Sequence, residues 1–238
     1  MDNSASRLLF ILEKCKEADK KLSCAQAWSQ VLNVSDDAEL MGAIGDFMKL
    51  AEQAGKEIMA DHPDELDSVR YWQRRILLGF KSAALSVTWD NFSNHIDSVS
   101  IFSLRSQSKI LNSSSNKKKI EIEEISKIIE IFQSSLELCS DLKISTKARK
   151  AICSRIEQII SLLNRYQYVG QDAVLDATKL LVADISLLPK EEKEEVFNSS
   201  TYSKLKEAAE NLANATTIIF ENPMITAAGT SLLNLLKQ

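Results

Sequence analysis

The sequence predicts an all-α protein, a multi-helix bundle of eight to ten helices. Gly and Pro are scarce: six Gly and three Pro make up about 4 % of the 238 residues, whereas average usage would give about 12 %. β-Hairpins and strand–helix crossovers need these residues for their turns, while long helices joined by short polar loops do not. Apolar residues also recur at helical spacing along most of the chain, and a 45 % apolar content suffices for a sizeable core.

Five helices are expected before residue 112. Ser23 and Gln26 form the pattern of a capping box, and Pro63 with the acids after it is typical of a helix start. The segment 96–111 also suits a short strand over 99–104, but its helical context favours a helix. The expected helices cover residues 4–21, a stretch that begins at 23, and residues 36–60, 63–94 and 96–111.

Two glycines, Gly42 and Gly45, lie inside the helix expected over 36–60. A glycine inside a helix costs about 1 kcal/mol relative to alanine. Close approach of another backbone would explain why glycine stands there, so we expect such a contact at these two positions.

The segment 112–119 (Asn-Ser-Ser-Ser-Asn-Lys-Lys-Lys) is polar and low in complexity, so it cannot bury a hydrophobic face. We interpret it as a linker between an N-terminal helical domain, residues 1–111, and a C-terminal helical domain, residues 120–238.

The C-terminal domain is expected to open with a long helical hairpin over 120–166. Its first arm carries an apolar seam with alternating spacings of three and four, and further apolar residues widen this stripe, which favours packing on two neighbours. Ser145 starts the second arm, and Gly170 is expected to end a helix or make a tight turn. The seam consists of Ile122, Ile125, Ile129, Phe132, Leu136 and Cys139, and further helices are expected over 171–188, 189–197, 201–220 and 222–236.

Charge and cysteine content exclude several function classes. The 29 basic and 33 acidic residues give a net charge of −4, so nothing in the global charge favours nucleic acid as a partner. The four cysteines show no CxxC spacing and lie among apolar or helical neighbours. We expect buried, reduced thiols in a cytoplasmic protein. No catalytic grouping, cofactor motif or metal-ligand spacing is present, and the acids around His62 are explained by helix capping.

One segment mixes basic and aromatic residues: Arg70, Arg74, Arg75 and Lys81 surround Tyr71 and Trp72. Arg70 and Arg74 share a helix face, where they would contact phosphates or an acidic partner. The alternative places Trp72 in the core and pairs the arginines with Asp67 and nearby acids. We favour this structural alternative because the chain is net acidic.

A polar pair, Asn91 and His95, shares a helix face at i, i+4 if the helix continues this far. It is a candidate half of a polar site. The alternative, which we favour, is a solvated pair or a pair that caps a helix end.

The C-terminal segment is a candidate membrane or partner helix. It is interrupted at 221–223, so each half is too short for a bilayer span of about 20 residues. A helix that closes the bundle, or that docks on a partner or a membrane surface, fits better, and we favour closure of the bundle over a membrane role. The residues concerned are Ile218, Ile219, Phe220, Met224, Ile225, Leu232, Leu233 and Leu236.

The order of residues from 145 to 188 resembles a pattern found in uncharacterised all-helical bacterial proteins. A helix with Arg155, Ile156, Ile159 and Leu163 is followed by Arg165-Tyr166, a short gap to Gly170 and a second helix. This resemblance implies a bacterial, intracellular protein. It assigns no function and no site residue.

The leading hypothesis is a non-enzymatic interaction module: a scaffold, adaptor or regulator that binds another protein or itself through apolar stripes such as those of the 120–166 hairpin. One alternative is a membrane-acting bacterial effector that uses the apolar C-terminal helices over 215–236. The other is a helical enzyme or nucleic-acid binder whose site lies around Arg70, Arg74, Asn91 and His95.

Overall fold

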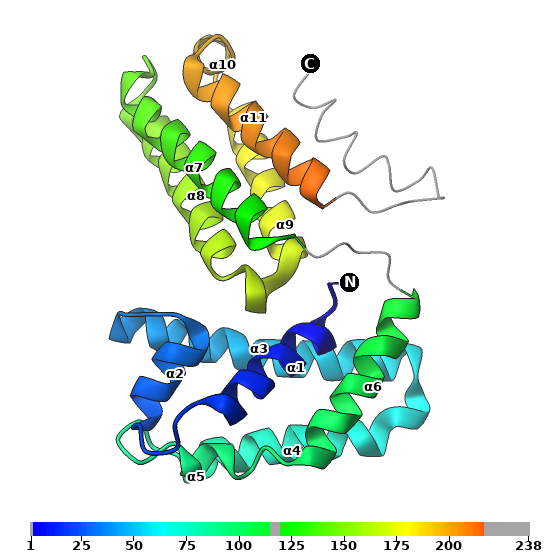
Figure 1. The fold of residues 1–238 in the computed structure, drawn as a ribbon. Helices are drawn as coiled ribbons and strands as arrows, with labels where there is room; N and C mark the ends of the chain where they lie inside the picture. Colours follow the sequence, from blue (N-terminus) through cyan, green and yellow to red (C-terminus); the bar gives the residue numbers. More distant parts are fainter. Residues whose placement is uncertain (1, 115–119, 217–238) are drawn as a thin grey trace. The chain divides into compact units, whose positions relative to one another are not determined.

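The computed structural model describes residues 2–114 and 120–216. Within these residues it contains eleven α-helices, two 3₁₀ turns and no strand (Figure 1). The all-α class is therefore confirmed, and the helix count exceeds the expected eight to ten. The chain divides into two compact units, unit 1 (Met1–Ser115) and unit 2 (Asn116–Gln238).

Unit 1 is built from six helices. Four of them form a ring, because α1 packs on α3 and α6, and α4 packs on the same two helices. The short helices α2 and α5 contact α3 and α4, respectively. The bounds are α1 Ser4–Glu17, α2 Cys24–Leu32, α3 Asp37–Asp61, α4 Leu66–Ser82, α5 Asp90–Ser93 and α6 Ser98–Ser114, with a 3₁₀ turn at Pro63–Glu65. Helix α6 thus extends past residue 111, into the segment expected to be a linker.

The helix expected over 63–94 is wrong as a single element. Helix α4 ends at Ser82, and the chain makes a turn before α5 begins at Asp90. The cause is long-range: the backbone N–H groups of Cys24 and Ala25, at the start of α2, donate to the carbonyls of Val87 (2.8 Å) and Leu85 (2.9 Å). The first N–H groups of a helix have no partner inside that helix. The segment after α4 supplies carbonyl acceptors to those N–H groups of α2, and for this reason it does not continue α4.

Five aromatic rings pack together in the core of unit 1. Trp28 lies 5.1 Å from Phe47, 5.4 Å from Phe80, 5.1 Å from Trp89 and 4.8 Å from Phe92, measured between ring centroids. Such tilted, stacked and edge-on pairs add to the stabilisation from burial alone. The cluster packs α2, α3, α4 and α5 against one another. The spacing of apolar residues within each helix does not predict this arrangement.

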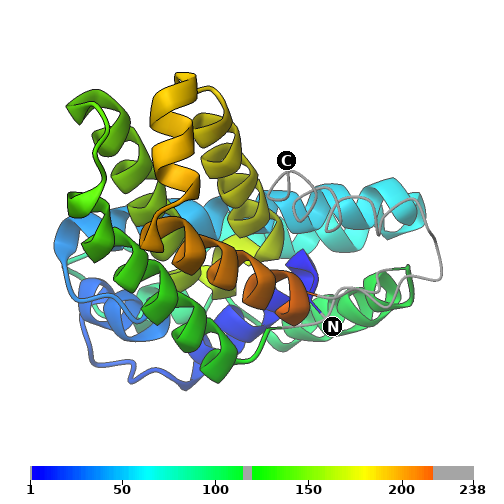
Figure 2. The ribbon, with the colours of Figure 1, turned by 90° about the horizontal axis from the view of Figure 1, so that it is seen from above.

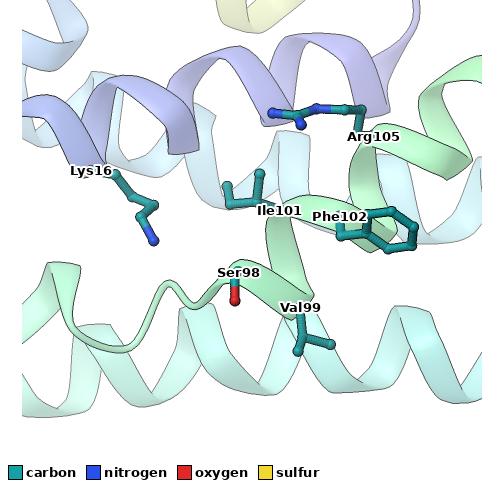
Figure 3. A pocket seen from close by; sticks show the side chains of 6 residues that line it. All are labelled: Lys16, Ser98, Val99, Ile101, Phe102 and Arg105. Carbon is teal, nitrogen blue, oxygen red and sulfur yellow. The ribbon is translucent and has the colours of Figure 1, made fainter.

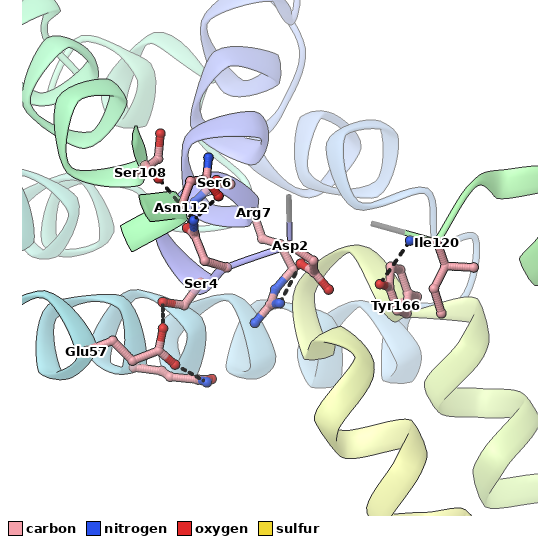
Figure 4. A network of polar contacts seen from close by, with 11 residues as sticks. Asp2, Ser4, Ser6, Arg7, Glu57, Ser108, Asn112, Ile120 and Tyr166 are labelled. Carbon is pink, nitrogen blue, oxygen red and sulfur yellow. Dashed lines mark hydrogen bonds and ion pairs between the residues drawn. The ribbon is translucent and has the colours of Figure 1, made fainter. Parts of the chain in front are cut away.

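The N-terminus of α1 is tied to α3 and α6 by polar contacts (Figure 4). Asn3 caps α1 by accepting from the backbone N–H of Ser6 (2.7 Å), and its amide donates to the carbonyl of Ser108 (3.0 Å). The hydroxyl of Ser4 donates to Glu57 on α3. Because these buried polar groups have partners on α6 and α3, they set the position of α1 in the ring.

The expectation for Gly42 and Gly45 is wrong. A Cβ atom at either position would meet nothing within 4 Å. The close approaches occur at Gly79 and Gly55 instead: a Cβ on Gly79 would lie 2.8 Å from the ring of Phe92, and one on Gly55 would collide with Gln73. Side-chain packing between helices, which spacing within one helix does not reveal, determines where glycine is needed.

Unit 2 contains the helical hairpin α7–α8, and α7 lies between α8 and α11 (Figures 1 and 2). Helix α8 packs in turn on α9. The bounds are α7 Ile122–Leu138, α8 Thr146–Asn164, α9 Tyr166–Ser186, α10 Lys190–Phe197 and α11 Ser200–Ala215, with a 3₁₀ turn at Cys139–Asp141. The predicted packing of the first hairpin arm on two neighbours is confirmed. The helix expected over 222–236 lies outside the described residues.

Most apolar residues of the hairpin stripes are buried or partly buried inside unit 2. Ile128 and Phe132 of α7 belong to one buried cluster with Ile156 of α8 and Leu212 of α11. These residues form a core, whereas Ile122 of the predicted seam is 75 % exposed, so its expected place in the seam is wrong. Gly170 breaks α9 with φ 73° and ψ 176°, a conformation open to glycine and strained for other residues, so the predicted interruption at this glycine is confirmed.

Candidate functional site

Helix α4 places three of the four candidate basic residues in one exposed line. Arg70, Arg74, Leu77 and Lys81 are spaced by four, three and four residues, so they share a face, and all four are exposed. The opposite face carries Val69, Trp72, Ile76 and Gly79, which are buried. We call the line formed by Arg70, Arg74, Leu77 and Lys81 the α4 basic stripe.

Arg75 does not belong to this stripe. Its Nε donates to the carbonyl of His95 (2.8 Å) and lies 3.2 Å from Oδ2 of Asp97. The prediction that Trp72 is a core residue is confirmed, because it is fully buried and its Nε1 donates to Gln107 (3.0 Å). Pairing of Arg70 and Arg74 with Asp67 is wrong: in the described part of the chain neither arginine forms an ion pair.

Asp97 joins α4 to the N-terminus of α6. Its Oδ1 accepts from the backbone N–H of Ser100 (2.8 Å), and its Oδ2 accepts from the hydroxyl of Tyr71 (2.6 Å). Partial burial acts to raise the pKa of Asp97, yet these hydrogen bonds and the charge of Arg75 outweigh it and hold the pKa below its ordinary value. The hydrogen bond to Asp97 in turn raises the pKa of Tyr71.

We expect Asp97→Asn to lower the free energy of unfolding of unit 1 by about 1–2 kcal/mol at pH 7. Because the pKa of Asp97 is depressed in the folded state, its ionised form stabilises the fold above about pH 4, and this contribution is lost as the pH falls through the folded pKa. Urea titrations followed by tryptophan fluorescence at pH 7 and pH 3 measure both values.

The control for this prediction is Asp67→Asn, an exposed carboxylate at the start of the same helix α4. It is expected to change stability by less than about 0.5 kcal/mol at both pH values. An Asp97→Asn loss that is as large at pH 3 as at pH 7 would contradict the assigned role of the charge.

The Asn91–His95 pair does not form the predicted i, i+4 site, because α5 ends at Ser93 and His95 lies beyond it. The amide of Asn91 donates to the carbonyl and hydroxyl oxygens of Thr88, both at 3.1 Å. The His95 ring lies 3.1 Å from the hydroxyl of Ser82. The side chains of Asn91 and His95 thus have different partners. The contacts of Asn91 with Thr88 agree with the capping alternative.

Helix α6 buries polar beside apolar side chains and leaves two apolar ones exposed, which the sequence analysis missed. Its buried face includes Ser100, Gln107 and Ser108 together with Leu104 and Leu111. Val99 and Phe102 are 55 % and 73 % exposed, respectively, whereas an amphipathic helix normally buries its apolar residues. The sequence of residues 96–111 shows no clean apolar face and so gives only a weak signal. The contacts of Gln107 and Asp97 with α4 reveal which face of α6 is buried.

An open hollow of about 500 Å³ lies between α1 and the first two turns of α6 (Figure 3). Arg105 bounds it and donates to Oε1 of Glu13 on α1 (2.6 Å), while Lys16 of α1 stands on the other side. We call it the α1–α6 hollow. Its lining consists of Lys16, Ser98, Val99, Ile101, Phe102 and Arg105.

Three of the four cysteine thiols are buried. Cys15, Cys24 and Cys139 are buried and free, while Cys153 is only half-buried, so the expectation of burial is wrong for that residue. Burial, assisted by the neighbouring Cys153, raises the pKa of Cys139 to about 12, and burial also raises the pKa of Cys15. These two groups remain protonated at neutral pH, and the thiol is the unreactive form.

Across residues 2–114 and 120–216, no group of three His, Cys, Asp or Glu side chains is arranged to hold a metal ion. Within that part of the chain, no helix has the length and apolar character needed to cross a membrane. The candidate residues from Ile218 to Leu236 lie outside the described residues.

Comparison with protein-family models, with curated proteins and with solved structures found no match to this chain. The features that bear on function are therefore the α4 basic stripe and the α1–α6 hollow.

Proposed function

We propose that this protein is a non-enzymatic interaction module that binds a second protein through the α1–α6 hollow. The observation that carries the proposal is the exposure of Phe102 and Val99 on α6. Exposing Phe102 and Val99 forgoes the stabilisation of about 1.5–3 kcal/mol that full burial of such a side chain brings. A protein partner that covers them would recover it.

The buried face of α6 supports the same conclusion. The side chain of Gln107 bonds with Trp72 and Glu65 (3.0 and 2.8 Å), and Leu104 and Leu111 are buried on the same side of α6. These contacts fix the buried face of α6 and leave Val99 and Phe102 exposed.

The hollow has the composition of a protein-binding site. Phe102, Val99 and Ile101 form an apolar centre, and Lys16 and Arg105 stand beside it. Protein interfaces commonly combine an aromatic anchor with a polar rim. We place the module in the bacterial cytoplasm; the buried free thiols of Cys15, Cys24 and Cys139 support a reducing compartment.

The test is native mass spectrometry of the full chain, gently isolated from its own cells, followed by binding measurements with the purified partner. Two variants are compared: Phe102→Asp, inside the hollow, and Met41→Asp, which adds the same charge at a 58 % exposed residue of α3 outside its lining. The wild type and Met41→Asp should retain one defined protein. Phe102→Asp should bind it at least tenfold more weakly.

Other outcomes overturn this proposal. A partner that Phe102→Asp retains at full affinity binds elsewhere, and a second copy of the chain identifies self-association. Retained lipid would favour the membrane-effector alternative, and retained nucleic acid the nucleic-acid-binding alternative. A bare monomer for the wild type contradicts a stable module.

A further inference from the structure

The α4 basic stripe carries three cations that the fold leaves without partners. Arg70, Arg74 and Lys81 form no ion pair or hydrogen bond in the described part of the chain. Some other cations of unit 1 are paired: Lys56 lies 2.6 Å from Glu52, and Arg105 lies 2.6 Å from Glu13. Asp67 is exposed one turn before Arg70, and the three cations outweigh it, so the stripe presents a local positive charge on a chain of net charge −4.

The stripe also has an apolar centre. Leu77 is 46 % exposed and stands between Arg74 and Lys81 on the same face. From Arg70 to Lys81 the stripe is about 16 Å long, at 1.5 Å per residue. This length corresponds to about three turns of a second helix laid along α4.

We propose that the α4 basic stripe binds an acidic amphipathic helix of a protein partner. Its carboxylates face Arg70, Arg74 and Lys81, and an apolar side chain between them covers Leu77. Arginine recognises carboxylates through two parallel hydrogen bonds, which adds orientation to the charge attraction. Helix-in-groove recognition uses anchors at this spacing.

A protein helix fits the stripe better than nucleic acid does. Phosphates lie along both strands of a duplex, and proteins that bind it neutralise many of them. The stripe supplies three cations, and Leu77 in its middle has no counterpart in a phosphate backbone. None of the four residues of the α4 basic stripe lines the α1–α6 hollow. The two surfaces are therefore separate, and failure of one proposal would not contradict the other.

The probe is a fluorescein-labelled helical peptide of 16 residues with Glu at positions i, i+4 and i+11 and Leu at i+7. A second peptide with the reversed order allows for either direction of binding. Fluorescence anisotropy with the full-length protein measures Kd at 50 mM and 300 mM salt. A scrambled peptide of equal charge, a duplex DNA and vesicles containing anionic lipid serve as competing probes.

Two variants test the stripe itself. Charge reversal of Arg70, Arg74 and Lys81 to Glu should weaken peptide binding at least tenfold. Leu77→Ser should weaken it about three- to tenfold and leave the salt dependence unchanged. The matched control reverses three exposed lysines of unit 2, Lys127, Lys147 and Lys150, and should keep the affinity within twofold. Circular dichroism and tryptophan fluorescence verify that each variant is folded.

The expected result is binding of one of the ordered peptides that is tighter than that of the scrambled peptide and weaker at 300 mM salt. Equal affinity for ordered and scrambled peptides would overturn the inference, because charge alone would then account for binding. Tighter binding of DNA or vesicles would overturn it as well. So would an affinity that the stripe reversal leaves intact, or no measurable binding of either ordered peptide.

Discussion

Phe92→Ala is expected to lower the free energy of unfolding of unit 1 by about 3–5 kcal/mol. Phe92 is fully buried, and its ring lies 4.8 Å from Trp28, 5.0 Å from Phe80 and 4.9 Å from Trp89. Removing it leaves a cavity that the neighbouring rings cannot fill, because each is held by further contacts. Urea unfolding followed by tryptophan fluorescence measures the loss, since Trp28, Trp72 and Trp89 all lie in unit 1.

Phe102→Ala is the control for this prediction, because the same atoms are removed from a side chain that is 73 % exposed. It should change stability by less than about 0.5 kcal/mol. Comparable losses for the two variants would show that Phe102 is packed in solution, and would contradict both the described core and the α1–α6 hollow.

Ile128→Ala is expected to destabilise unit 2 by about 2–5 kcal/mol. Ile128 is buried on α7, in the cluster that this helix shares with α8, α9 and α11. Unit 2 contains no tryptophan. The variant should therefore shift the unfolding transition seen by circular dichroism at 222 nm and leave the fluorescence midpoint of unit 1 in place.

Ile122→Ala provides a control on the same helix, because Ile122 is 75 % exposed at the start of α7. Its effect should stay below about 0.5 kcal/mol. If Ile128→Ala also shifted the fluorescence midpoint, the two units would unfold as one cooperative block, and the assignment of separate cores would be wrong.

Two surfaces of unit 1 now carry the functional proposals. The α1–α6 hollow offers an apolar anchor site, and the α4 basic stripe offers a charged one. A protein that uses both would bring two partners together, as a scaffold or adaptor does. Two other candidate residues, Arg75 and Asn91, are instead engaged in contacts inside unit 1.

Sequence reasoning located helix ends well where the signal is local. The capping box of Ser23 and Gln26 and the cap at Ser145 both lie where the sequence placed them. Each of these signals needs only residues within one turn of the helix start. The break at Gly170 was predictable for the same reason, since glycine alone adopts its backbone conformation without strain.

The candidate site was only partly predictable. The common face of Arg70, Arg74 and Lys81 follows from spacing along one helix. The diversion of Arg75 to Asp97 does not, because the two residues meet only after the chain has turned back after α5. The end of α4 at Ser82 is likewise set by α2, because the backbone N–H groups of Cys24 and Ala25 donate to the carbonyls of Val87 and Leu85 in the segment after α4.

The sequence by itself determined the all-α class, the starts of most helices and the seam of α7, because caps and apolar periodicity act within a few residues. Only the tertiary structure decided which face of α6 is buried, which arginines stay unpaired and which glycines are needed for packing. The physical reason is that Gln107, Asp97 and Phe92 act on residues that are distant in the chain. Burial and pairing depend on all neighbours at once, and the neighbours are known only when the helices have packed.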